Sequence, residues 1–133
     1  MGRMMVLGVS LIALIAAGTA AAHETRYPTA SSFGFVEGPT AAWGVVSSTQ
    51  AGCVKGRLVK LFRKKPGPDR LMGRDRSGIP SGSGDGFWEI ERSLPDGKYY
   101  ARVIKKNIGR GSHRHLCRAY TTSVLNYPGG TPG

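Results

Sequence analysis

The sequence predicts an all-β protein built as a single antiparallel β-sandwich of six or seven strands. Three observations carry this prediction. Short runs of alternating apolar and polar residues recur between residues 43 and 125, clusters of Gly, Pro, Asp and Ser separate them, and no stretch after residue 22 keeps the 3.6-residue period of an amphipathic helix. Alternation at this spacing is typical of two packed sheets, each with one buried and one hydrated face.

The chain opens with the pattern of a secretory signal peptide. Residues 1–22 combine a positive charge at Arg3, an apolar run over 6–17 and small residues before His23. The apolar run is too short for a permanent transmembrane helix, and we expect no transmembrane segment in the mature chain. We therefore expect a secreted protein. Removing 22 residues from the 133-residue chain leaves 111, enough for one domain.

The remaining chain divides by composition into three segments. We expect a flexible N-terminal arm at 23–42 with a short strand near 33–37, a β-sandwich domain at 43–127, and a flexible tail at 128–133. Within the domain, the expected strands cover 43–48, 54–63, 70–76, 87–92, 99–106 and 116–125. The segments 77–86, rich in Gly and Ser, and 107–115, rich in basic residues, are expected to be loops.

Alternation within these runs predicts the core. In the run 87–92, Trp88 and Ile90 share one face, and Glu89 and Glu91 share the other, where we expect them to pair with Lys or Arg across the sheet. Trp88 is expected to fill the core, because small sandwiches usually bury a large aromatic residue. The full expected core set is Val59, Leu61, Trp88, Ile90, Tyr99, Ala101 and Val103.

Two cysteines, Cys53 and Cys117, follow the leader. In an exported protein an even pair is most simply a disulfide, and two cysteines allow only one intramolecular pairing. Such a bridge closes a loop of about 64 residues, which corresponds to about 4 kcal/mol in the chain-entropy description. We therefore expect Cys53 and Cys117 to be joined.

Positive charge dominates the composition. The chain carries 19 Lys and Arg against 8 Asp and Glu, a net charge of +11, of which Arg3 in the leader contributes one. A net charge of this size favours contact with polyanions, although it also keeps an exported protein soluble. The charge gathers in 55–76 and 98–118. If these segments pair, their basic side chains and the aromatics Phe62 and Tyr100 form one surface.

Such a surface predicts binding to an anionic cell-wall or extracellular polymer, or to nucleic acid, with strong salt dependence. The competing interpretation is a hydrated face whose Lys and Arg discourage edge-to-edge aggregation. The candidate polyanion-binding residues are Lys55, Arg57, Lys60, Arg63, Lys64, Lys65, Arg102, Lys105 and Lys106.

A string of short motifs resembles the transthyretin-like, or carboxypeptidase regulatory-like, β-sandwich of exported bacterial proteins. Its strongest parts are Gly86-x-Trp88 and Gly97-x-Tyr99, and the similarity covers roughly 43–125. The resemblance implies that the tyrosine lies inside at a strand start and that the protein is an accessory or surface module rather than a catalyst. The loop before Trp88 departs from the family pattern, because Ser81-Gly82-Ser83-Gly84 lengthens it.

The histidines suggest a second hypothesis. Cleavage after residue 22 leaves His23 as the first residue, which can chelate copper through its amine and ring nitrogens, and His113 and His115 follow in the basic loop. Together they predict a copper-binding or redox protein. Against this interpretation, neighbouring arginines at 110, 114 and 118 repel a cation.

No arrangement of acids, serines and histidines in the sequence has the spacing of a known catalytic motif. We therefore expect a non-catalytic, secreted structural or binding module, with no cofactor and no small-molecule substrate. The copper-binding interpretation is the alternative.

Overall fold

The computed structural model describes residues 23–36, 41–78, 86–109 and 111–127. The expected signal peptide, the tail at 128–133 and most of the glycine-rich loop lie outside these ranges. The described residues confirm the all-β prediction, and none of their helices is long and apolar enough to cross a membrane. In chain order the elements are β1 (His23–Tyr27), β2 (Thr29–Ser31), β3 (Gly34–Val36), β4 (Ala41–Ser48), a 3₁₀ turn η1 (Ala51–Cys53), β5 (Leu58–Arg63), β6 (Arg70–Arg76), β7 (Phe87–Glu91), β8 (Gly97–Val103), β9 (Lys106–Asn107), β10 (His113–Cys117), β11 (Tyr120–Thr121) and β12 (Leu125–Tyr127).

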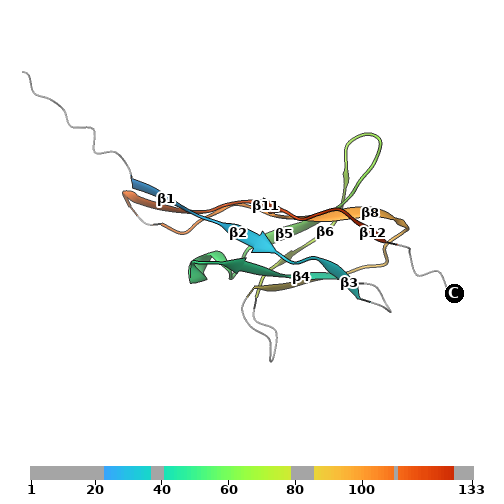
Figure 1. The fold of residues 1–133 in the computed structure, drawn as a ribbon, viewed down its shortest axis with the longest axis horizontal. Coiled ribbons are helices and arrows are strands. Elements are labelled where there is room, and N and C mark those ends of the chain that lie inside the picture. The colour runs from blue at the N-terminus through green and yellow to red at the C-terminus, as the bar shows by residue number, and fades with distance from the viewer. Residues whose placement is uncertain (1–22, 37–40, 79–85, 110, 128–133) are drawn as a thin grey trace, which may run out of the picture.

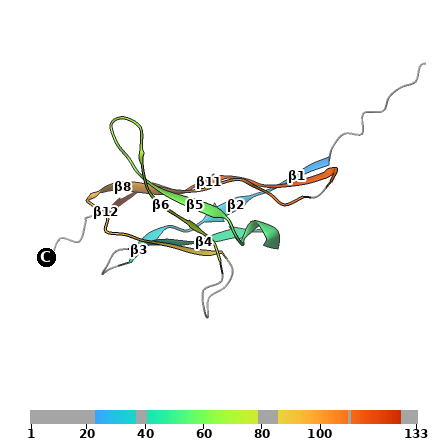
Figure 2. The same cartoon turned by 180° about the vertical axis from the view of Figure 1, so that it is seen from behind.

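Two antiparallel sheets form the layers of a sandwich (Figure 1). The first, which we call the five-stranded sheet, has the order β11-β8-β5-β6, with β12 also paired to β8. The second is centred on β4, which pairs with β2, β3 and β7. Seen from behind, the same two layers lie one above the other (Figure 2). β6 and β7 are also in contact, where the Glu89 amide donates to Asp75 Oδ2 at 2.9 Å.

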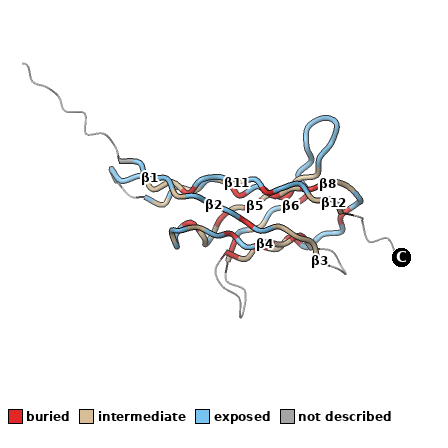
Figure 3. Tube along the Cα trace, in the orientation of Figure 1, coloured by how far each residue is buried: buried red, intermediate tan, exposed pale blue. Residues whose placement is uncertain are grey.

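The core lies between these layers, and Figure 3 shows its buried residues along the facing strands. All seven expected core residues are buried, which confirms the set, and Ala42, Val46, Met72 and Leu94 join them. Trp88 is fully buried, and its indole N–H donates to Ser31 Oγ at 2.9 Å. Gly44 lies opposite Trp88, and a Cβ there would collide with the indole ring and the Ser32 carbonyl oxygen.

A third, smaller sheet extends beyond the sandwich. β10 pairs with β9 in the antiparallel sense and with β1 in the parallel sense, giving the order β1-β10-β9 (Figure 1). We call this extension the β1–β10 arm. The parallel pair departs from the purely antiparallel sandwich that the sequence predicts. It is possible because β1 and β10 lie far apart in the chain, so a long connection separates them.

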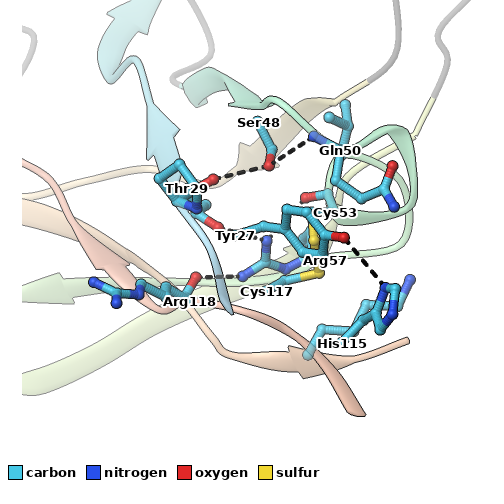
Figure 4. The surroundings of a disulfide bond; sticks show 12 residues. Tyr27, Thr29, Ser48, Gln50, Cys53, Arg57, His115, Cys117 and Arg118 are labelled. Carbon is cyan, nitrogen blue, oxygen red and sulfur yellow. Dashed lines mark hydrogen bonds between the residues drawn. A yellow bond between two sulfur atoms is a disulfide. The ribbon is translucent and has the colours of Figure 1, made fainter. Parts of the chain in front are cut away.

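The expected disulfide joins Cys53 in η1 to Cys117 at the end of β10, with the two Cα atoms 5.4 Å apart. Both cysteines are fully buried. The bond therefore fixes the base of the β1–β10 arm to the end of the sandwich (Figure 4).

Beside the disulfide lies Arg57, also fully buried and without a carboxylate partner (Figure 4). Its guanidinium donates to Thr29 Oγ1 at 3.0 Å and to the carbonyl oxygens of Cys53 at 2.8 Å, Ile104 at 2.7 Å and Arg118 at 2.9 Å. Its Nε also donates to the Ile104 carbonyl. Burial lowers its pKa. The preceding turn at Cys53 and three segments that are distant in sequence thus share one cation, whose planar fork satisfies all four acceptors.

The N-terminal segment differs most from expectation. Residues 23–36 form three strands rather than a flexible arm, with Thr29 and Ser31 buried, although the short strand near 33–37 is present as β3. The expected final strand at 116–125 is divided among β10, β11 and β12, and β10 begins inside the expected loop at 107–115. β1 and β10 pair with each other although they are distant in sequence, whereas β2 and β3 pair with the following strand β4. The patterning within each segment does not reveal its partner.

Candidate functional site

Three basic residues cross the outer face of the five-stranded sheet in one line, which we call the basic row: Arg74, Lys60 and Arg102. Lys60 in β5 lies opposite Arg74 of β6 on one side and opposite Arg102 of β8 on the other. Because neighbouring strands lie about 4.8 Å apart, the row crosses three strands in about 10 Å. The residues that flank Lys60 and Arg102 in their strands point into the core, so alternation directs the basic side chains outward.

An apolar row lies beside the basic row, two residues further along β5. Phe62 lies opposite Leu71 of β6 and Tyr100 of β8. The Phe62 and Tyr100 rings are stacked, with centroids 5.4 Å apart and planes at 20°. Leu71 is 40% exposed, and the two rings are half-buried. The face therefore presents a flat apolar surface next to a line of positive charge.

The Tyr100 ring is held in place by its hydroxyl group. Tyr100 Oη donates to Asp69 Oδ2 at 2.6 Å, and the Lys65 amide donates to the other carboxylate oxygen at 3.1 Å. The hydrogen bond from Tyr100 lowers the pKa of Asp69, and the same bond raises the pKa of the Tyr100 phenol. Asp69 lies in the β5–β6 hairpin, which projects away from the second layer beside this face (Figure 1).

The basic row carries like charges in direct opposition. Within the described residues, the only salt bridge joins Arg26 to Glu24, so no carboxylate pairs with Lys60, Arg74 or Arg102. Like charges directly opposite each other on neighbouring strands are destabilising, by up to about 1 kcal/mol a pair. β5 and β8 are interior strands of their sheet, so Lys60 and Arg102 do not guard an exposed edge. Among the residues that the structure describes, Lys60, Arg74 and Arg102 therefore form no ion pair that stabilises the fold.

The structure brings together only part of the predicted polyanion-binding set. Lys60 and Arg102 lie in the basic row, and Lys64 and Lys65 are exposed in the adjacent hairpin. Arg63 ends β5 and donates to the Asp96 carbonyl oxygen. Arg63 has the same parity in β5 as the buried Val59 and Leu61 and lies opposite the buried Tyr99, so it points to the other side of the sheet from Lys60.

The other predicted residues lie elsewhere. Arg57 is wrong as a surface contact, because its side chain is fully buried and bound to backbone carbonyls. Lys106 Nζ donates to the Lys55 carbonyl oxygen at 3.0 Å, which places both residues near η1. Lys105 is exposed between β8 and β9. None of the four faces outward from the central strands of the five-stranded sheet.

Sequence reasoning missed Arg74 and Leu71. Leu71 and Arg74 are three residues apart, so strict alternation would place them on opposite faces of β6. The bulge near Leu61 and Phe62 shifts the register and brings both to the outer face. Alternation in 70–76 signals an exposed Arg74, whereas only the strand register shows that it lies opposite Lys60.

The outer face of the second sheet has the opposite character. Trp43 and Phe87 stack there with centroids 6.3 Å apart and planes at 25°, next to Val45, which is 39% exposed. Glu89 lies opposite Trp43, and Glu91 lies opposite Ala41. The expected pairing of these two glutamates with Lys or Arg is therefore wrong. Desolvation, followed by repulsion from Glu91 and Asp75, raises the pKa of Glu89.

The three histidines belong to the paired strands of the β1–β10 arm. His113 and His115 belong to strand β10 rather than to a loop, and the register of the parallel pair places His23 opposite His113. Among the side chains that the structure describes, which exclude that of His23, no group of three or more His, Cys, Asp or Glu could hold a metal ion. His113 and His115 alone thus do not complete a site.

No protein-family model, curated protein or solved structure matches this chain. The transthyretin-like resemblance therefore stays a prediction from its motifs.

Proposed function

We propose that this protein is a secreted, non-catalytic binding module that holds an anionic cell-surface or extracellular polymer against the outer face of the five-stranded sheet. One observation carries the proposal: Arg74, Lys60 and Arg102 stand in register on a sheet face, beside a stacked aromatic pair and without a carboxylate partner among the described residues. A polymer with regularly spaced negative charges would relieve the repulsion within the row. Charge-assisted hydrogen bonds to Lys and Arg would then replace unfavourable cross-strand contacts.

The apolar row adds a second kind of contact. Flat rings such as those of Phe62 and Tyr100 offer a stacking surface for sugar or base rings, and the neighbouring cations contact the acidic groups between them. The two lysines of the adjacent hairpin, Lys64 and Lys65, extend the positive surface along the same side. The proposed ligand is therefore a polymer that combines ring faces with negative charge, such as an acidic polysaccharide.

Two features support export. The disulfide between Cys53 and Cys117 is typical of proteins that fold in an oxidising compartment. Residues 1–22 have the charge and apolar pattern of a secretory leader. We also propose membership of the transthyretin-like group, on the strength of Gly86-x-Trp88 and Gly97-x-Tyr99.

The test compares two double variants with the same loss of charge. Lys60→Gln/Arg102→Gln removes two members of the basic row, and Lys55→Gln/Lys105→Gln removes two exposed charges elsewhere. Binding to fluorescein-labelled heparin is measured by anisotropy over a range of NaCl concentrations. We expect the first variant to bind at least ten-fold more weakly and to lower the slope of log K against log salt by about 2.

We expect the second variant to change affinity by less than three-fold, because net charge acts through long-range attraction that salt screens. Equal losses in the two variants would show that heparin responds to net charge alone and would reject the proposed site. Repeating the titration with lipoteichoic acid distinguishes sulfated from phosphate-containing polymers.

A further inference from the structure

β1 is an edge strand with one unpaired side. Its other side pairs with β10 over all five residues, and among the strands that the structure describes, none pairs with the second side. Figure 1 shows β1 at one end of the molecule, beyond the two layers of the sandwich. Glu24, Thr25 and Arg26 are exposed. The free side of β1 therefore presents backbone groups with which another strand can pair.

The other sheet edges have features that discourage pairing with another chain. β6 carries three arginines and a bulge against β5, and the outer edge of β7 is in contact with β6, where the Glu89 amide donates to Asp75. The strands β2, β3, β9, β11 and β12 have at most three residues each. β1, in contrast, has five residues in continuous register with β10, contains neither Lys nor Pro, and carries one acid and one base.

The backbone of β1 determines which residues can pair on the free side. The Tyr27 carbonyl oxygen accepts a hydrogen bond from the Arg118 amide at 3.0 Å, so residue 27 directs its N–H and C=O groups toward β10. Successive residues of a strand direct these groups to opposite sides, so those of Glu24 and Arg26 point away from β10. The outward backbone groups of β1 thus belong to two residues of opposite charge.

We propose that β1 pairs in the antiparallel sense with β1 of a second copy of this chain, about a two-fold axis at Thr25. This register places Glu24 of each copy opposite Arg26 of the other, and each such pair exchanges two backbone hydrogen bonds. Opposite charges on directly opposed residues stabilise a strand pair. The adjacent registers that also align outward groups are centred on Glu24 or Arg26, and they place like charges opposite each other.

The neighbouring side chains fit this register. Glu24 lies opposite Arg114 of β10, so Arg114, Glu24 and the second copy's Arg26 would form a row whose charges alternate. Within one chain Glu24 and Arg26 form a salt bridge at 3.2 Å, but both side chains are exposed, so exchanging this bridge for a contact between chains costs little. A two-stranded ribbon has little stability alone, and the pairing would join the two arms in one continuous sheet.

The proposed dimer is independent of the polymer-binding face, because β1 belongs to a different sheet and the interface uses none of the basic row. Either proposal can fail without the other. Since one five-residue strand from each copy forms the backbone pairing, we expect reversible association rather than an obligate dimer.

Sedimentation velocity of the purified, exported protein over a range of concentrations, in about 0.15 M NaCl, measures this association. The variants are Glu24→Lys and Arg26→Glu, each of which places like charges opposite each other. Glu91→Lys and Lys105→Glu are matched controls with the same changes of charge outside β1. We expect a monomer–dimer equilibrium in the unmodified protein and in both controls, and a dimer dissociation constant about ten-fold higher in each β1 variant.

Mixing the two β1 variants tests the register itself. In a mixed pair, both basic residues of the Glu24→Lys chain lie opposite both acidic residues of the Arg26→Glu chain. We expect an equimolar mixture to form heterodimers at concentrations where each variant alone is monomeric. Thr25→Cys should also form a disulfide between chains, because residue 25 lies opposite itself at a Cα distance of about 4.5 Å, whereas the control Ala30→Cys should not.

Three results would overturn the proposal. The first is an unmodified protein that stays monomeric up to about 1 mM. The second is a dissociation constant that changes equally in the β1 variants and in their controls, because net charge would then explain the effect. The third is a mixture of the two β1 variants that stays monomeric. If a single variant fails to fold, Glu24→Lys/Arg26→Glu replaces it, and this double variant should dimerise as the unmodified protein does; loss of its dimer would also reject the register.

Discussion

The two outer faces of the sandwich share an architecture and differ in charge. Each has a stacked aromatic pair, Phe62 with Tyr100 on the five-stranded sheet and Trp43 with Phe87 on the second sheet. The first pair lies beside the basic row, whereas the second lies beside Glu89. An exposed aromatic pair therefore does not by itself indicate a polyanion site.

The charges that surround each pair distinguish the faces. The basic row keeps three like charges in register on interior and edge strands without a carboxylate, an arrangement that weakens the sheet. On the second face, desolvation and then repulsion from Glu91 raise the pKa of Glu89. A bound anion would offset the repulsion within the basic row.

The largest expected effect concerns a basic residue on neither face. Arg57→Met should lower the free energy of unfolding by about 4 kcal/mol, because it leaves buried carbonyl groups without a donor. The same substitution at exposed Arg102 should change it by less than about 0.5 kcal/mol. Urea denaturation measures both. Similar values for the two variants would contradict the distinction between a structural cation and a surface one.

Replacing each aromatic pair with alanine compares the contribution of the two faces to heparin binding. Phe62→Ala/Tyr100→Ala should weaken heparin binding about ten-fold, which corresponds to about 1.4 kcal/mol of lost stacking. Trp43→Ala/Phe87→Ala should change it by less than two-fold. Anisotropy titrations at one salt concentration are sufficient. If the second variant loses more affinity than the first, the ligand binds the acidic side.

Removing the central charge of the basic row should raise stability while it weakens binding. Lys60→Gln relieves repulsion from both Arg74 and Arg102, so the free energy of unfolding should rise by about 0.5 kcal/mol. Lys105→Gln, which lies outside the sheet face, serves as the control and should leave the free energy of unfolding unchanged. Denaturation in low salt makes the difference largest. A loss of stability in Lys60→Gln would show that Lys60 has a structural partner.

The smallest expected effect is a change in the pKa of Asp69 in the β5–β6 hairpin. The hydrogen bond from Tyr100 lowers the pKa of Asp69 below its ordinary value of 3.8, so this contact stabilises the fold above pH 3.8 and is lost as pH falls through the lowered value. Tyr100→Phe should raise the pKa of Asp69 toward 3.8. A carboxyl ¹³C titration measures it. An unchanged pKa would show that Asp69 is held mainly by the Lys65 amide.

Alternation along single strands predicted much of the fold. The core set in β5, β7 and β8 and the outward positions of Lys60 and Arg102 follow from alternation along each strand, and the disulfide follows from the presence of only two cysteines. Pairing between distant segments determined the rest. The strands at 23–36 and the position of Arg74 opposite Lys60 depend on register, which no local pattern contains.

Arg57 shows the same limit for a single residue. Its sequence neighbours, Lys55 and Lys60, are also basic, and the pattern gives no sign that its side chain turns inward. Burial becomes favourable only when Thr29, Cys53, Ile104 and Arg118 all supply acceptors. Three of these acceptors lie 28 or more positions from Arg57 in the sequence, so only the folded chain brings them together.

Mapping the bound ligand onto the backbone shows which outer face of the sandwich binds the polymer. A ¹⁵N-labelled sample is titrated with a heparin oligosaccharide, and amide chemical shifts are followed residue by residue. If the polymer binds the five-stranded sheet, the largest shifts fall within 58–62, 71–76 and 98–103, on the strands of the basic and apolar rows. Shifts concentrated in 41–48 and 87–91, or spread evenly over the lysines and arginines of the whole chain, would contradict it.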